Sequence, residues 1–223
     1  MIATSTNYLA LIEDRPPGTV LMLSNVSWDE YEELLEELVE QPSYRLTYYT
    51  GKLEIMTVSS EHEGPAHLLP HLIAVIAEEC DLDFLSRGST TLRKKKKAKG
   101  TDPDDCYYFK EYKKIAGKKR LDLSVDPPPD LAIEIDITSG SLPKFPIYAA
   151  LGVPELWRHD GKQVRFYRLE DEDYYEIDAS DLFPFLTPDV VLDFLEEGEA
   201  EGTIAMVKKF RKWVKKHKHL RRS

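Results

Sequence analysis

The feature that most constrains this chain is the segment 127–139, which reads PPPDLAIEIDITS. Proline fixes φ and lacks a backbone N–H, so three consecutive prolines exclude a helix and give the segment a sharp start. The residues after them alternate between apolar and acidic or small side chains, which is the period of a β-strand. We therefore predict a strand with one apolar face, formed by Leu131, Ile133, Ile135 and Ile137, and a second face formed by Asp130, Ala132, Glu134, Asp136 and Thr138.

The carboxylates on the second face need an explanation, because burying an unpaired charge costs several kcal/mol. Glu134 and Asp136 would lie about 6.6 Å apart on a strand that rises about 3.3 Å per residue, so both can reach one ion or a pair of ions. Asp130 would lie about 13 Å from Asp136, too far to share that ion. The alternative is an edge strand, or a one-sided antiparallel strand, whose polar face lies in water.

Charge is distributed unevenly along the chain. The net charge of −10 argues against a general nucleic-acid coat, but residues 203–223 hold nine Lys or Arg and no acid, so the rest of the chain carries −19. Further basic runs lie at 93–99 and 110–120. A polyanion would have to contact these local patches, although such runs also occur as solvated loops and tails.

Length and composition indicate a single globular domain with appendages. A chain of 223 residues that is 42% hydrophobic can bury a substantial core, and no apolar run approaches the length of a membrane span. The N-terminus lacks the basic-then-apolar order of a signal peptide, so we expect a cytoplasmic protein that does not contact a membrane. Cys80 and Cys106 are too few for a disulfide framework, and we expect reduced thiols.

Local patterns predict an α/β or α+β domain. Ser27 and Glu30 form a capping-box pattern before a helix, and Thr50-Gly51 separates two strands of a hairpin at 44–49 and 52–58. We expect an N-terminal arm at 1–18, a main domain at 19–200 and a basic C-terminal helix at 201–223. Within the main domain we predict further helices at 60–80, 141–152 and 187–195, and strands at 84–92, 102–109, 155–159, 164–169 and 174–177.

Acids from two predicted strands, together with a lysine, suggest a chemistry. Asp104 lies on the strand before Glu134 and Asp136, and Lys144 follows shortly after them, so these side chains can converge. Hydrolysis of a phosphodiester uses such a set, because carboxylates hold Mg²⁺ or Mn²⁺ and a lysine stabilises charge on the phosphate oxygens. A zinc site would favour His and Cys ligands. His67 and His71 share a helical face but lack the HExxH pattern, so a surface position is favoured for them.

Four segments resemble the Uma2 family, a restriction endonuclease-like family abundant in cyanobacteria. They are the stretches DPDDCYY at 102–108, PDLAIEIDITS at 129–139, YAALGVPELWR at 148–158 and the helix start SEHE at 60–63. The resemblance spans roughly residues 20–200.

The resemblance implies a PD-(D/E)XK nuclease fold, in which a mixed central sheet is flanked by helices. It implies that Asp104 and Glu134 are the acids of the first and second motifs. Asp136 occupies the position of the usual Glu-x-Lys lysine, so the resemblance makes Lys144 the displaced lysine and Asp136 an added metal ligand. By the same analogy His62 and Glu63 lie near the site.

Two hypotheses about function follow. The first is a Mg²⁺- or Mn²⁺-dependent endodeoxyribonuclease that acts on duplex DNA as a homodimer, with Lys94, Lys95, Lys96 and Lys97 contacting the nucleic acid. The second is a non-catalytic nucleic-acid or protein interaction module that keeps the nuclease fold and uses the basic C-terminal helix as its contact surface. A glycosidase with paired carboxylates is not favoured by the distribution of aromatic residues.

Overall fold

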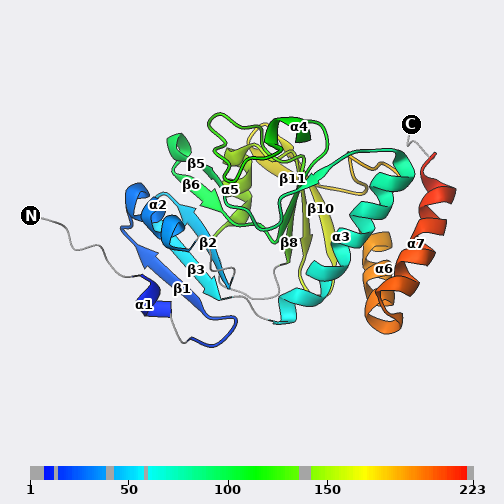
Figure 1. Ribbon diagram of the computed structural model, residues 1–223, viewed down its shortest axis with the longest axis horizontal. Helices are drawn as coiled ribbons and strands as arrows, with labels where there is room; N and C mark the ends of the chain where they lie inside the picture. Colours follow the sequence, from blue (N-terminus) through cyan, green and yellow to red (C-terminus); the bar gives the residue numbers. More distant parts are fainter. Residues whose placement is uncertain (1–7, 13–14, 39–42, 58–59, 136–141, 220–223) are drawn as a thin grey trace, which may run out of the picture.

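A computed structural model of the protein describes residues 8–12, 15–38, 43–57, 60–135 and 142–219, without the side chains at 9–10 and 60–64. The described strands form two sheets (Figure 1). The larger sheet has the order β11-β10-β9-β8-β7-β4, and only the β8–β9 pair is parallel, which makes the sheet mixed. Its strands are β4 (Leu85–Ser86), β7 (Asp105–Tyr108), β8 (Leu131–Ile135), β9 (Glu155–His159), β10 (Val164–Glu170) and β11 (Asp173–Ile177).

The smaller sheet is antiparallel throughout and has the order β1-β3-β2-β6-β5. The predicted hairpin forms its centre, and the turn between the two strands places Thr50 and Gly51 at φ values of 44° and 86°. Its strands are β1 (Val20–Ser24), β2 (Tyr44–Tyr49), β3 (Lys52–Thr57), β5 (Leu92–Lys94) and β6 (Lys99–Thr101).

Helices cover both faces of the larger sheet, which confirms the expected mixed α/β architecture. One face packs against α3, α6 and α7, which lie side by side in Figure 1, and the other packs against α5. The smaller sheet packs against α2. The helices are α1 (Leu9–Ile12), α2 (Trp28–Glu37), α3 (Ser60–Cys80), the short 3₁₀-helix η1 (Lys95–Lys97), α4 (Tyr112–Ile115), α5 (Lys144–Leu151), α6 (Pro188–Glu201) and α7 (Thr203–His217).

Two local predictions hold in atomic detail. Ser27 caps α2 by accepting a hydrogen bond from the backbone N–H of Glu30, while the Glu30 carboxylate accepts one from the backbone N–H of Ser27, which completes the capping box. Strand β8 turns its apolar residues Leu131, Ile133 and Ile135 to the core beneath α3. Residues 136–141, which include Asp136 and Ile137, lie outside the described part of the chain.

The alternative of a solvated polar face on β8 is wrong. The strand lies between β7 and β9 in the middle of the sheet, and all five of its residues are buried. Helix α5 covers the face that carries Ala132 and Glu134. Glu134 therefore has only 6% of its surface exposed, and such a buried carboxylate needs partners.

The prediction of a single strand at 84–92 needs correction. The expected strand at 84–92 is two strands, β4 and β5, which belong to different sheets and are separated by a turn with Gly88 at φ 54°. Within the expected N-terminal arm, the side chains of Tyr8 and Ile12 are buried against the α2 side of the smaller sheet.

The basic C-terminal helix packs on the main domain. Helix α7 contacts α3 and α6 and buries Met206, Phe210 and Val214, whereas Ile204 is 67% exposed. Arg211 pairs with Glu79 of α3 at 2.8 Å. Across the residues that the structure describes, we find no helix that is both long and apolar enough to cross a membrane. Both cysteines are free thiols.

Candidate active site

Asp104 lies immediately before β7, and its carboxylate is hydrogen-bonded to β8 at the residue after Glu134. The antiparallel β7–β8 ladder ends with Asp105 opposite Ile133, so Asp104 lies just beyond it, where β8 continues with Glu134. Two hydrogen bonds fix this position: the Asp104 N–H donates to the Ile133 carbonyl at 3.1 Å, and the Ile135 N–H donates to Asp104 Oδ2 at 2.6 Å. Besides the larger effects of burial and of Glu134, the charge of Asp104 acts on the pKa values of Lys144 and Tyr148 in α5, so its carboxylate lies on the side of β8 that α5 covers.

Lys144 brings an ammonium group to these acids. It is the first residue of α5, and its Nζ lies 3.5 Å from Glu134 Oε1. The same Nζ donates hydrogen bonds of 3.0 Å to the hydroxyls of Thr47 and Thr101, which face each other across the β2–β6 ladder of the smaller sheet. Lys144 therefore links the two sheets and is held from three directions.

The surrounding carboxylates keep Lys144 charged. Burial lowers the pKa of its amine, but the negative charges of Glu134, Glu54, Asp104 and Asp102 outweigh burial, so the pKa lies above its ordinary value. An amine with a raised pKa holds its proton at neutral pH. Lys144 can therefore donate hydrogen bonds and stabilise negative charge, but it is poorly suited to accept a proton.

Tyr148 is a further member of the site, one turn after Lys144 on α5. Its hydroxyl donates a hydrogen bond to Glu134 Oε1. Burial, followed by the negative charge of Glu134, raises the pKa of this phenol well above its ordinary value, so the hydroxyl keeps its proton. The sequence signal for Tyr148 is its spacing of four residues from Lys144, because residues at i and i+4 share one face of a helix.

Glu54 is also close to Lys144 and was not predicted. It lies on β3 opposite Thr47, has 2% of its surface exposed, and accepts a hydrogen bond of 2.6 Å from the Leu142 N–H just before α5. Its charge contributes to the raised pKa of Lys144. An acid between Leu53 and Ile55 on a strand was the available signal, but nothing local indicates that the smaller sheet meets α5.

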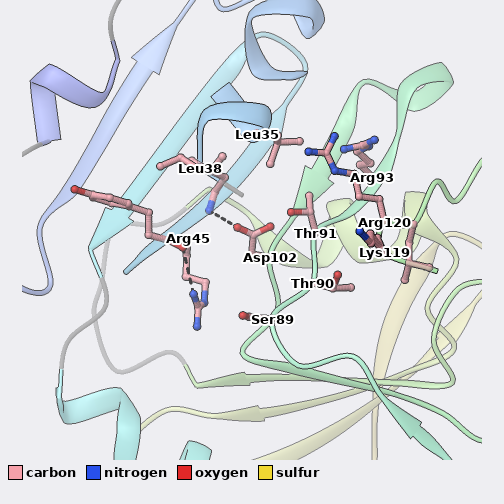
Figure 2. Close-up of a pocket in the computed structure, with 13 residues that line it drawn as sticks. Leu35, Leu38, Arg45, Ser89, Thr90, Thr91, Arg93, Asp102, Lys119 and Arg120 are labelled. Atoms are coloured by element: carbon pink, nitrogen blue, oxygen red, sulfur yellow. Dashed lines mark hydrogen bonds between the residues drawn. The ribbon is translucent and has the colours of Figure 1, made fainter. Parts of the chain in front are cut away.

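Asp102, two residues before Asp104, points elsewhere. Its Oδ2 accepts a hydrogen bond of 2.8 Å from the Leu46 N–H, and burial raises the pKa of its carboxyl group. The side chain lines a pocket on the α2 side of the smaller sheet (Figure 2). The two acids of the Asp-Pro-Asp motif therefore serve different parts of the molecule.

The remaining predicted residues are only partly described. Asp136 lies outside the described residues, and the structure gives the helical backbone of His62 and Glu63 but not their side chains. Lys94 ends β5, and Lys95, Lys96 and Lys97 form the exposed helix η1. Lys95 pairs with Asp29 of α2 at 3.1 Å, and no contact in the described chain brings this run to Glu134. His67 and His71 are exposed, as predicted.

The donor set fits a hard divalent cation of the Mg²⁺ type. Among the described side chains, no group of three or more His, Cys, Asp or Glu residues is arranged to hold a metal ion. Mg²⁺ does not require such a group, because it keeps several waters and typically binds proteins through one or two carboxylates. Asp104 and Glu134 supply two carboxylates on one face, and Lys144 beside them supplies a positive charge.

Comparisons with known proteins concern the whole domain. One similar solved structure is the crystal structure of "a putative nuclease belonging to DUF820 from Anabaena variabilis ATCC 29413", with 14% sequence identity and a TM-score of 0.46; the match covers 82% of this chain and 99% of that chain. No curated protein matches this sequence.

The model of the Uma2 family, described as "Putative restriction endonuclease", matches residues 28–195. This range covers about three quarters of the chain and includes Asp104, Glu134, Lys144 and Tyr148. The predicted resemblance is thereby confirmed, and the chain belongs to the Uma2 family.

Proposed function

We propose that this protein is a metal-dependent endonuclease that hydrolyses DNA phosphodiester bonds at Asp104, Glu134 and Lys144. The observation that supports it most strongly is the convergence of two neighbouring carboxylates with a largely buried, charged amine that lies 3.5 Å from one of them. Membership of the Uma2 family gives independent support. The reaction class is phosphodiester hydrolysis: a water oxygen bonds to phosphorus, the bond to the leaving sugar oxygen breaks, and that oxygen takes up a proton.

In this proposal Asp104 and Glu134 hold Mg²⁺ or Mn²⁺. The metal would lower the pKa of a bound water and neutralise charge on the phosphate. Lys144, as a fixed ammonium, donates hydrogen bonds to the phosphate oxygens that gain negative charge, and Thr47 and Thr101 aim its Nζ. Tyr148 keeps Glu134 in place by donating to one of its oxygens.

The proposal extends to the DNA and to the assembly. Lys95, Lys96 and Lys97 are exposed on η1, at the end of a strand next to the one that carries Thr101, and would contact the phosphate backbone. Because a duplex has two strands, a homodimer with two such sites would cut both. Asp136 would act as a third metal ligand.

The test of this function is nicking of supercoiled plasmid by the purified full chain with Mg²⁺ or Mn²⁺. We expect nicking that EDTA stops, and a loss of at least a hundredfold in Asp104→Asn and Glu134→Gln. The control is Glu172→Gln, which removes an exposed carboxylate from the β10–β11 turn. Equal nicking by wild type and Glu134→Gln would refute the proposal. DNA binding without nicking would favour the non-catalytic module.

A further inference from the structure

A pocket of about 430 Å³ lies on the α2 side of the smaller sheet (Figure 2). It is formed by the end of α2, the start of β2, the turn at 89–91 and residues 119–121, and we call it the Asp102 pocket. Thr101 and Asp102 are successive residues, and the Thr101 hydroxyl binds Lys144 while the Asp102 carboxylate lines the pocket. The pocket is therefore separate from the candidate active site.

The Asp102 carboxylate offers an acceptor inside the pocket. The residue is 9% exposed, and its Oδ2 is occupied by the Leu46 N–H. Its Oδ1 is buried and has no partner with full hydrogen-bond geometry among the described residues; the Thr91 hydroxyl lies near the carboxylate and interacts with it weakly. Leaving a buried acceptor without a hydrogen bond costs free energy. A ligand that places an N–H at Oδ1 removes this cost and therefore binds more tightly than a ligand that contacts only the surface.

Positive side chains line the same pocket. Figure 2 shows Arg93, Lys119 and Arg120 grouped on one side of it, across from Arg45. Arg93 Nε lies 3.3 Å from Glu32, and Arg120 pairs with Glu36, so two acids of α2 fix the guanidinium groups without entering the pocket. Lys119 is exposed. This side of the pocket is suited to an anionic group such as a phosphate.

The rest of the lining combines the hydroxyl side chains of Ser89, Thr90 and Thr91 with apolar residues. Leu35 and Leu38 from the α2 side, together with Leu121, contribute hydrophobic surface. A bare inorganic anion would leave this surface unused and would meet the Asp102 carboxylate. A ligand that fits all three features has a flat apolar body, an N–H donor at one end and an anion at the other. A nucleotide has this arrangement, and pockets of ≈ 300–1,000 Å³ are of the size that holds such ligands.

We propose that the Asp102 pocket binds one nucleotide unit, with an amino group of the base donating to Asp102 and the phosphate facing Arg93, Lys119 and Arg120. This inference goes beyond the proposed nuclease activity and stands without it, because it concerns binding alone. Adenine, cytosine and guanine carry an exocyclic amino group. Thymine presents an N–H between two carbonyl oxygens, which the carboxylate repels, so thymidylate binds more weakly.

The test is calorimetric titration of the full-length Glu134→Gln protein, which cannot hydrolyse DNA if the proposed mechanism holds, with dAMP, dCMP, dGMP, dTMP and deoxyribose 5-phosphate. We expect at least one amino-bearing nucleotide to bind at least tenfold more tightly than dTMP and deoxyribose 5-phosphate. Equal binding of deoxyribose 5-phosphate, or no binding of any nucleotide, would overturn the proposal. Wild-type protein titrated with the same mononucleotides gives the same ranking whether or not the protein is a nuclease.

Two variants test the two ends of the ligand. Lys119→Ala/Arg120→Ala should weaken the best nucleotide at least tenfold, whereas Lys212→Ala, which removes an exposed lysine of α7, should not. Asp102→Asn presents an amide donor to the pocket in place of a carboxylate, so the discrimination against dTMP should disappear. Unchanged affinity in the first variant and unchanged discrimination in the second would overturn the assignment.

A further arm distinguishes a free nucleotide from one within a DNA strand. A duplex that carries 2-aminopurine opposite an abasic site gains fluorescence when the base leaves the stack. If the fluorescence rises and added dGMP reverses the rise, the ligand is an extrahelical nucleotide of the strand. Binding of free nucleotides without such a rise identifies a free mononucleotide as the ligand.

Discussion

Lys144 Nζ lies 3.5 Å from Glu134 Oε1, and through this contact the smaller sheet holds an amine over a carboxylate of the larger sheet. The lysine comes from α5, its supporting hydroxyls from β2 and β6, and the acid from β8. The geometry of the proposed site therefore depends on the packing of the two sheets around α5, and substitutions at this junction should affect both stability and activity.

Lys144→Met should reduce plasmid nicking at least a hundredfold and also destabilise the fold. Glu134 would lose its buried cation, and removing one partner of a buried ion pair typically costs about 3–5 kcal/mol. Denaturant unfolding followed by tryptophan fluorescence measures this. The double variant Lys144→Met/Glu134→Gln removes the stranded charge as well, so it should regain stability without regaining activity. Equal stability of the single and double variants would contradict the ion-pair account.

Tyr148→Phe should weaken the proposed function without removing a group that contacts the phosphate. The variant loses only the hydroxyl that donates to Glu134, so the carboxylate becomes less well positioned. We expect nicking to require a higher Mn²⁺ concentration for half-maximal rate, with a smaller effect on the rate at saturating Mn²⁺. Unfolding experiments should show a loss of about 1–3 kcal/mol, typical of a hydrogen bond to a charged group. An unchanged Mn²⁺ dependence would mean that Tyr148 serves stability alone.

Gly100→Ala should destabilise the smaller sheet. A Cβ at this position would overlap the Tyr31 hydroxyl and lie 3.1 Å from Cζ of the same ring, and overpacking of this kind costs about 1–3 kcal/mol. The Tyr31 hydroxyl is buried without a hydrogen-bond partner in the described chain, so Tyr31→Phe alone should be close to neutral. Gly100→Ala/Tyr31→Phe should recover part of the loss. If the double variant recovers no stability in thermal unfolding experiments, contact with the Tyr31 hydroxyl is not the cause of the loss.

Helix α7 should be required for folding, whereas its exposed positive charges should not be required for nicking. Truncation after Gly202 removes Met206, Phe210 and Val214 from the core and should unfold the domain. The variant Lys208→Gln/Lys212→Gln/Lys216→Gln changes only exposed residues and should unfold at the wild-type midpoint. Loss of DNA retention in this triple variant, with nicking absent in wild type, would instead favour the interaction module.

The sequence was informative wherever a local rule decides the structure. The alternation at 127–139 predicted β8, the Thr50-Gly51 pair predicted the hairpin, and the Ser27–Glu30 box predicted the start of α2. These features depend on backbone preferences and on contacts within a few residues. The family resemblance added the expectation that Asp104 and Glu134 form one site; the Asp104 carboxylate bonds β8 at the residue after Glu134, and the shared role stays a prediction.

The parts that could not be predicted depend on long-range packing. Nothing near Glu54, Thr47 or Thr101 indicates that a second sheet supports Lys144, because these residues lie between 43 and 97 positions from the groups that they contact. The strand expected at 84–92 was wrong for a similar reason: its two halves join different sheets. The burial of both faces of β8 follows from α5, whose position local patterns do not specify.

The most direct measurement is the anomalous diffraction of a crystal grown with Mn²⁺. The account predicts a manganese peak within coordination distance of both the Asp104 and Glu134 carboxylates in the wild-type protein, and no peak there in Glu134→Gln. Absence of a manganese peak between these two residues would contradict the account, if the same protein nicks plasmid at the same Mn²⁺ concentration.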